Sequence, residues 1–293
     1  GEPGKPIRIS SFPLACEPIQ SLLAPLRDRL RATQELRRKL FQLEFLSTLA
    51  GDTLVSLIYH RPLEQAWEDA ASQLATEFGM AIVGRSRKQK VVIGRDYVTE
   101  TLRINGRDFH YRQYEQAFTQ PNALVNTRMI EWAIDAAGAN NGDLLELYCG
   151  NGNFTLPLAG SFNHVIATEL SKVSTRAAQH NLAENNVGNV HIIRLAAEEV
   201  SQAIAGDREF RRLAVLPRPL SDYQLDTVFV DPPRAGLDDA TIAMVSGFNR
   251  ILYISCNPET LAQNVAALTE SHRIKRFAMF DQFPYTDHME CGV

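Results

Sequence analysis

The stretch LLELYCGNGNFTLPLA, residues 144–159, decides the fold because it joins an apolar strand to a glycine-rich turn and then to a helix. Such a turn lets the backbone come close to a nucleotide at the start of the helix. Further apolar segments alternate with helical patterns, at 164–169, 190–195, 225–230, 250–255 and 273–280. Strands that alternate with helices predict an α/β fold with a parallel, doubly wound sheet covered by helices on both faces.

The chain before this region follows a different pattern. Short strands with alternating polarity begin in residues 41–60 and turn at a Gly-Asp pair, which favours an antiparallel sheet with helices around 18–39 and 64–78. We therefore predict a smaller α+β domain at 1–118, incomplete at its N-terminus, and a catalytic domain at 119–293 that stops within its last strand.

Charge divides the chain at a similar place. The net charge of −4 is the balance of +3 over residues 1–120 and −7 over residues 121–293. The basic stretches RDRLRATQELRRK and GRSRKQK, which include Lys39 and Arg87, could face the phosphates of a nucleic acid. A solvated helix face and a charged hairpin turn would explain the same residues, so charge alone leaves both readings open.

Composition indicates a soluble protein of the cytoplasm. The 293 residues are 45% hydrophobic, yet no apolar run approaches the roughly 18 residues of a membrane span, and the first residues resemble no signal peptide. The four cysteines, at 16, 149, 256 and 291, lack the close spacing of a metal site or redox motif. We expect reduced thiols, no metal cluster and no membrane contact.

The glycine-rich turn predicts a nucleotide-containing cofactor. Glu169 ends the next strand, nineteen residues after Gly150, where a carboxylate can accept hydrogen bonds from both hydroxyls of a ribose. The turn reads G-x-G-x-x-T, so it lacks the third glycine of the dinucleotide fingerprint. S-adenosylmethionine, which has a ribose but no pyrophosphate, fits better than a nicotinamide cofactor. A plain structural turn remains the alternative.

Two further strand ends carry residues with chemical potential. Asp231 ends the fourth strand and is followed by two prolines, which hold its carboxylate outward at the edge of the sheet. Cys256 ends the fifth strand, where Asn257 and Pro258 begin a helix whose N-terminus favours a thiolate. A cysteine is more often an inert buried side chain, but its place at a strand end favours a nucleophile.

A methyl donor beside a cysteine suggests methylation of uracil. Addition of a thiolate to carbon 6 makes carbon 5 nucleophilic, and a base must then remove the hydrogen from carbon 5. Glu290 is a candidate for this base because its strand should return to the same edge of the sheet. Spacing alone would favour a surface charge for a glutamate near the chain end.

Four segments together resemble the RNA uracil-5-methyltransferase family, and the resemblance covers nearly the whole chain. They are LELYCGNGNF, FVDPPRAGL, ILYISCNPETL and DQFPYTDHMECGV. The resemblance implies a Rossmann-like methyltransferase domain after an RNA-binding domain, with Cys256 as nucleophile and Glu290 as base. It also implies that five residues surround S-adenosylmethionine, namely Gln120, Tyr148, Asn153, Glu169 and Asp231.

The resemblance also implies the substrate. Ribosomal members of this family commonly hold an iron-sulfur cluster with four N-terminal cysteines, whereas only Cys16 precedes the expected catalytic domain. We therefore expect the T-arm of tRNA as substrate, other RNAs with a similar stem-loop as further substrates, and a monomeric enzyme.

A uridine in a folded loop must leave its stack, so we expect it to flip into a pocket between the two domains. Candidates for stacking against the base are Phe118, Tyr148 and Phe154. Two other functions stay open at this point. An amino-group methyltransferase also uses an acid before two prolines but needs no thiol, and an RNA-binding or folding protein could keep the fold without catalysis.

Overall fold

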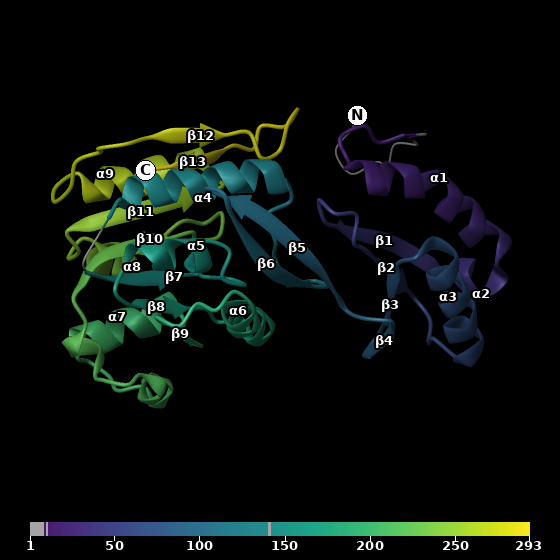
Figure 1. The fold of residues 1–293 in the computed structure, drawn as a ribbon, viewed down its shortest axis with the longest axis horizontal. Helices are drawn as coiled ribbons and strands as arrows, with labels where there is room; N and C mark the ends of the chain where they lie inside the picture. The colour runs from purple at the N-terminus through teal and green to yellow at the C-terminus, as the bar shows by residue number, and fades with distance from the viewer. Residues whose placement is uncertain (1–8, 10, 140–141) are drawn as a thin grey trace. The chain divides into compact units, whose positions relative to one another are not determined.

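The computed structural model describes residues 9, 11–139 and 142–293, and it divides into two compact units (Figure 1). The first unit comprises the residues up to Glu100 together with Gln113–Gln116, and the second comprises Thr101–Arg112 and Ala117–Val293. No helix among the described residues is both long enough and apolar enough to cross a membrane.

The first unit is a four-stranded sheet with three helices. Its elements are α1 (Glu17–Ala32), α2 (Gln34–Arg37), β1 (Leu40–Ser47), β2 (Thr53–Tyr59), α3 (Gln65–Phe78), β3 (Ala81–Ser86) and β4 (Gln89–Ile93), with strand order β1-β2-β3-β4. The prediction of an antiparallel sheet is wrong for the central pair, because β2 and β3 run parallel. Helix α3 connects them, and a parallel pair requires such a crossover.

The core of the first unit lies between α3 and the sheet. Trp67 of α3 is 1% exposed and packs so closely over β3 that a Cβ atom at Gly84 would lie 2.2 Å from its ring. Glu115 is also buried in this unit, where its carboxylate accepts hydrogen bonds from Arg85 and Ser56. An ion pair with Arg85 therefore compensates the buried charge.

A hairpin of β5 (Tyr97–Ile104) and β6 (Arg107–Tyr114) runs from the first unit to the second. Two asparagines at the C-terminal end of α6 (Lys172–Glu184) hold strand β6 of this hairpin. Arg112 N donates to Asn181 Oδ1 over 2.7 Å, and His110 N donates to Asn185 Oδ1 over 2.8 Å. A boundary at residue 118 would leave this hairpin with the first unit, whereas residues 101–112 make their contacts with the second.

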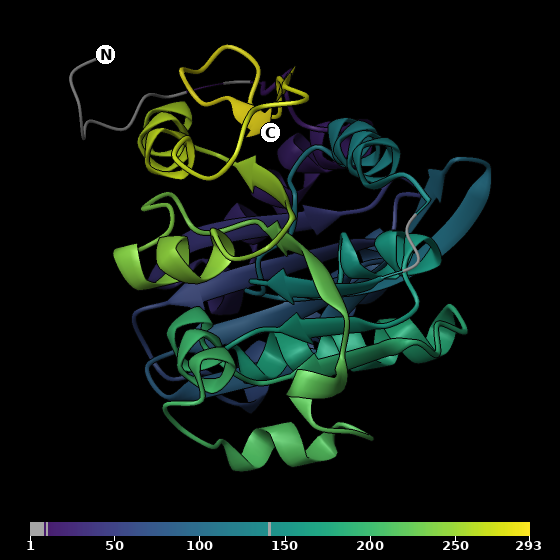
Figure 2. The ribbon, with the colours of Figure 1, turned by 90° about the vertical axis from the view of Figure 1, so that its left-hand side faces the viewer.

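The second unit contains a seven-stranded sheet. Its strands are β7 (Asp143–Leu147), β8 (Val165–Thr168), β9 (Val190–Ile193), β10 (Leu225–Val230), β11 (Arg250–Ser255), β12 (Ala278–Phe280) and β13 (Glu290–Gly292), in the order β12-β13-β11-β10-β7-β8-β9. The order reverses between β7 and β10, and β13 is antiparallel to both of its neighbours. The C-terminal segment, yellow in Figure 2, lies beside the light green strand β11 with which it pairs.

Helices cover both faces of this sheet. They are α4 (Ala123–Ala137), α5 (Thr155–Leu158), α6 (Lys172–Glu184), α7 (Ala197–Ala205), α8 (Asp239–Val245) and α9 (Pro258–Leu268), with short 3-10 helices at Ala159–Ser161, Arg211–Val215 and Leu220–Asp222. Successive strand residues enter different cores: Leu144 packs with residues of α4, α5 and α6, whereas Leu145 packs with residues of α7, α8 and α9. Nearly continuous apolar strands are what burial on both faces requires.

Candidate active site

Three strands bring Asp231, Cys256 and Glu290 to one edge of the second unit's sheet. Asp231 follows β10 directly, and Cys256 follows the neighbouring parallel strand β11. Strand β13 runs the other way, with Cys291 opposite Ser255, so Glu290 lies one residue further along, beside Cys256. The carboxyl ends of parallel strands therefore meet the beginning of an antiparallel strand at this edge.

The loops after β10 and β11 hold each other in place. Asn257 caps α9, since its side chain accepts a hydrogen bond of 3.1 Å from Glu259 N. Its Nδ2 also donates to the carbonyl oxygen of Arg234 over 3.2 Å, and Thr260 Oγ1 donates to the same oxygen. The Asp-Pro-Pro loop is thus fixed relative to the cysteine.

Burial disfavours negative charge throughout this cluster. Glu290 is 2% exposed and its Oε2 has no partner among the described residues, so burial raises its pKa to about 7. Burial and the charge of Glu290 raise the pKa of Asp231 to about 8. Burial and both carboxylates also raise the pKa of Cys256, although Arg234 opposes this. Burial and the two carboxylates therefore outweigh the predicted preference of the helix N-terminus for a thiolate in the protein without ligands.

The turn after β7 leaves open space above its backbone. Gly150 has φ +56°, and a Cβ atom built there would meet nothing within 4 Å. Gly152 has φ +86°, and its Cβ atom would lie 2.6 Å from Leu156 Cδ1. Tyr148 also adopts a positive φ of 61°, a conformation that strains a bulky residue. The turn is thus open on its Gly150 side and packed against α5 on its Gly152 side.

Glu169 lies at the end of β8 and is oriented by the backbone. Its Oε2 accepts from Gly150 N over 3.1 Å, and its Oε1 accepts from Ser171 N over 2.7 Å. Each carboxylate oxygen has two lone pairs, so each can accept one more hydrogen bond. This geometry presents two acceptors beside the open turn.

Asn153 is held by a residue that the sequence did not indicate. Its side-chain amide pairs reciprocally with that of Asn126 in α4, with two hydrogen bonds of 2.8 Å, and its carbonyl oxygen accepts from Tyr111 Oη. Asn126 is 4% exposed and lies within the apolar face of a helix. A polar residue in such a pattern is the one signal that could have indicated it.

Gln120 lies at the same edge of the sheet because of the direction of α4. Arg250, at the start of β11, donates to the carbonyl oxygens of Ala136 and Ala137, so the C-terminal end of α4 lies at the amino end of the strands. The N-terminal end, which Gln120 precedes, is therefore at the carboxyl ends. There Gln120 Oε1 accepts a hydrogen bond of 2.9 Å from Gln282 Nε2.

The three candidates for stacking against the base differ in how far they are exposed. Phe154 is 2% exposed and packs against Phe229 with ring centroids 4.8 Å apart, so the prediction that it stacks on a base is wrong. Phe118 is 71% exposed. Tyr148 is half-buried, and burial and the charge of Asp238 raise its pKa.

Glu146 of β7 is a buried carboxylate that the sequence did not single out, and burial raises its pKa to about 8.

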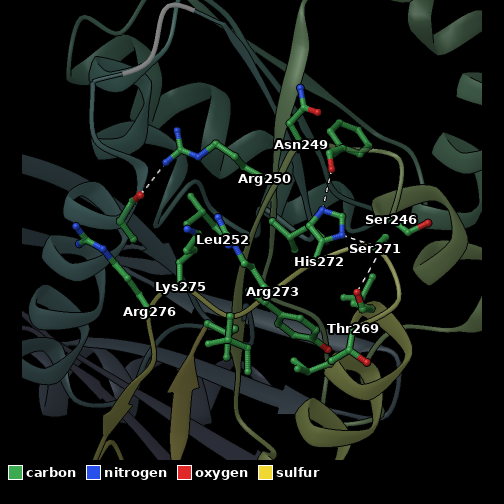
Figure 3. Close-up of a pocket in the computed structure, with 18 of the residues that line it drawn as sticks. Ser246, Asn249, Arg250, Leu252, Thr269, Ser271, His272, Arg273, Lys275 and Arg276 are labelled. Carbon is green, nitrogen blue, oxygen red and sulfur yellow. Dashed lines mark hydrogen bonds between the residues drawn. The ribbon is translucent and has the colours of Figure 1, made fainter.

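A pocket of about 830 Å³ lies at the opposite edge of the sheet. Arg250, Leu252 and Arg276 line it, with His272 bonded to the carbonyl oxygen of Phe248 (Figure 3). None of the seven predicted site residues lines this pocket. Ligands of open α/β sheets bind beyond the carboxyl ends of the strands, so its position is not that of a catalytic site.

Known proteins resemble this chain over its length. A family model described as tRNA (Uracil-5-)-methyltransferase matches residues 2–293. The tRNA/tmRNA (uracil-C(5))-methyltransferase of Pseudomonas entomophila is 57% identical over 293 residues, which are 100% of this chain and 81% of that protein. The protein of the same name from Azoarcus sp. is 54% identical over 292 residues, which are 100% of this chain and 80% of that protein.

A solved structure shares the fold. The tRNA (uracil-54, C5)-methyltransferase of Pyrococcus abyssi, in complex with S-adenosyl-L-homocysteine, matches with a TM-score of 0.72 and 21% identity. The match covers 98% of this chain and 69% of that one. At this identity the likeness establishes the fold alone.

Proposed function

Because this chain belongs to the tRNA (uracil-5-)-methyltransferase family, we propose that it transfers a methyl group from S-adenosylmethionine to carbon 5 of a uridine in the T-loop of tRNA. The observation that carries the proposal is the convergence of Asp231, Cys256 and Glu290 at one sheet edge beside the open turn. An amino-group methyltransferase would have no use for the thiol.

The residues at the turn fit S-adenosylmethionine. Gly150 leaves room for the adenosine above the backbone, and the two free acceptor positions of Glu169 match the two hydroxyls of a ribose. Tyr148, Asn153, Gln120 and Asp231 complete the set of residues that would hold the cofactor. When bound, S-adenosylmethionine supplies the methyl group as an electrophile on a sulfonium.

Cys256 supplies the nucleophile. Its thiolate adds to carbon 6 of the uracil, the C5–C6 double bond opens, and the electron pair makes carbon 5 nucleophilic enough to accept the methyl group. The raised pKa of Cys256 keeps the thiol protonated and unreactive in the absence of ligands. Arg234 lowers that pKa, so it helps to stabilise the thiolate once the site is occupied.

Glu290 completes the cycle as the base. Its carboxylate removes the proton from carbon 5, the double bond re-forms, and the bond between carbon 6 and Sγ breaks with its electron pair returning to sulfur. A pKa of about 7 suits this role because a base operates best with a pKa near the working pH.

The first unit supplies phosphate contacts in this proposal. Lys39 and Arg87 are both exposed. His60 N donates to the carbonyl oxygen of Lys39, and Ser86 Oγ donates to that of Arg61, the residue after His60. Because Arg87 directly follows Ser86, these two contacts support the placement of Lys39 and Arg87 at the same end of the unit. Exposed basic side chains gathered in this way favour an RNA partner. The names of the relatives include tmRNA, which supports other stem-loop RNAs as further substrates.

The experiment that tests this function mixes the protein and S-adenosylmethionine with a tRNA transcript that contains 5-fluorouridine, followed by a denaturing gel. Fluorine cannot leave carbon 5 as a proton does, so a covalent protein–RNA band should accumulate. Cys256→Ala should give no band, whereas Cys16→Ala, which changes an exposed thiol in the first unit, should give one. Methylation of unmodified tRNA by Cys256→Ala at the wild-type rate would support the amino-group alternative.

A further inference from the structure

We propose that Gln282 determines the specificity for uracil by accepting a hydrogen bond from N3–H of the flipped base. This inference rests on the proposed function and adds a residue to it. Gln282 lies two residues after the end of β12 and is 2% exposed, although glutamine is a residue that proteins rarely bury. Its side chain therefore needs partners for both ends of the amide.

One end of the amide has its partner and the other does not. Gln282 Nε2 donates to Gln120 Oε1 over 2.9 Å, whereas Gln282 Oε1 is buried with no hydrogen-bond partner among the described residues. Such an unpaired buried acceptor costs about 1–3 kcal/mol of desolvation. A donor that arrives with the substrate would remove this cost, so the structure has an acceptor ready for a ligand.

Gln120 determines which end of Gln282 is available. An amide can present either its oxygen or its NH₂ group, and the two orientations differ by a simple rotation. In the structure Gln120 Oε1 accepts from the NH₂ group of Gln282, and this hydrogen bond leaves Gln282 Oε1 as the end of the amide without a partner among the described residues. Gln120 is thus a positioning residue for Gln282, in addition to its place beside the cofactor.

The order of the strands matches the order of the ring atoms. In the sheet, Cys256 follows β11, the next strand β13 begins with Glu290, and Gln282 comes shortly after β12, which is next to β13. Around the uracil ring, carbon 6 is followed by carbon 5, carbon 4 and N3. A base with carbon 6 at Cys256 and carbon 5 at Glu290 therefore presents its O4 and N3 edge toward Gln282.

The same order favours the base over the cofactor as the donor. Neighbouring strands are about 4.8 Å apart, so β12 lies two spacings, or about 10 Å, from β11. The end of β8, where Glu169 lies, is five spacings or about 24 Å away. Gln282 is on the side of the nucleophile and the base, where the substrate reacts.

An acceptor at this place distinguishes uracil from cytosine. O4 of uracil is an acceptor, so a carbonyl oxygen selects the N3–H group beside it. Cytosine has no hydrogen on N3, so its N3 lone pair would face the lone pair of Gln282 Oε1. Its N4 amino group could donate to Oε1 only if the ring left the position that carbon 6 takes at Cys256. A site that hydrogen-bonds a substrate N–H can reject the analogue that lacks it by about 10⁴-fold or more, because the buried group stays unpaired.

The test compares methylation of two T-arm stem-loop RNAs, with uridine or cytidine at the target position, by the wild type, Gln282→Leu and Gln282→Glu. At pH 6 a buried glutamic acid keeps a carbonyl oxygen as acceptor. We expect Gln282→Leu to lower kcat/KM on uridine by about a hundredfold and to leave the rate on cytidine unchanged or higher. Gln282→Glu should recover to within about tenfold of the wild type on uridine.

The control is Gln263→Leu, which changes an exposed glutamine of α9 and should alter neither rate. A loss on uridine below threefold in Gln282→Leu, or equal losses in the leucine and glutamate variants, would overturn the role of Gln282. Such a result would leave the proposed function standing, because the wild type would still methylate the uridine stem-loop. An inactive wild type would instead contradict the proposed function itself.

Discussion

Glu290 makes the stability of the second unit depend on pH in a direction opposite to that of most carboxylates. Burial raises the pKa of Glu290 from 4.5 to about 7, so the folded protein holds a proton that the unfolded chain releases. Stability therefore falls as pH rises from about 4.5 to about 7, and it stays low above that range. One pKa unit corresponds to about 1.36 kcal/mol, so the whole decline is roughly 3 kcal/mol.

Replacement of Glu290 by glutamine should remove this decline, because the amide is neutral at every pH. We expect Glu290→Gln to unfold with nearly the wild-type free energy at pH 4.5 and to be more stable by roughly 3 kcal/mol at pH 8. Asp231, whose pKa of about 8 is raised by burial and by the charge of Glu290, adds a decline of its own, and this decline should be smaller in Glu290→Gln, so the difference between the two proteins at pH 8 includes this coupling.

Urea unfolding at several pH values measures this difference. The chain has two tryptophans, and Trp132 packs against Gly292 and Phe280 of the second unit, so a Trp67→Phe background makes fluorescence report on that unit. The exposed Glu270→Gln is the matched control and should follow the wild type at every pH. If Glu290→Gln also follows the wild type from pH 4.5 to pH 8, Glu290 is not held neutral by burial and the reasoning fails.

Three further predictions concern other parts of the chain. Gly152→Ala should lower the free energy of unfolding by about 1–3 kcal/mol in urea titrations, because its Cβ atom would lie 2.6 Å from Leu156 Cδ1 at a φ of +86°. Glu115→Gln should destabilise the first unit by about 1–3 kcal/mol at pH 7, because it removes charged hydrogen bonds of a buried carboxylate. Ionic partners lower the pKa of this carboxyl despite its desolvation, so the loss should shrink as the pH falls through the lowered pKa, and a loss that does not change with pH would contradict this. Lys39→Ala and Arg87→Ala should each weaken tRNA binding and reduce the slope of log affinity against log salt by about 1, and an unchanged slope would exclude that residue from the interface.

The edge where Asp231, Cys256 and Glu290 meet could be predicted in part from the sequence, because it follows from strand directions. Asp231 and Cys256 end neighbouring parallel strands, and the carboxyl ends of such strands meet at one edge. The position of Glu290 needed more than spacing, since three residues of strand at the chain end give no periodicity to read. It was a candidate because its strand should return to this edge, and the resemblance favoured a base over a surface charge. The pairing of Cys291 with Ser255 explains its position physically.

Other features depend on contacts that no local pattern encodes. The parallel pairing of β2 and β3 is decided by the packing of α3 on the sheet, whereas the alternating polarity of the strands is compatible with either direction. Gln282 and Gln120 are 162 residues apart and meet only because β12 and α4 end at the same edge. The pKa of Cys256 likewise depends on carboxylates from two other strands.

Asp231, Cys256 and Glu290 titrate as a coupled set rather than as three independent groups. Asp231 and Glu290 raise the pKa of Cys256, and Glu290 raises that of Asp231, so each group is easiest to ionise when the others are neutral. Replacement of Glu290 by glutamine should therefore lower the pKa of the Cys256 thiol. Alkylation of Cys256 by iodoacetamide, followed against pH by mass spectrometry, measures that pKa. The alkylation profile of Glu290→Gln should move to lower pH than that of the wild type, and a profile that stays in place would show that the two groups do not interact.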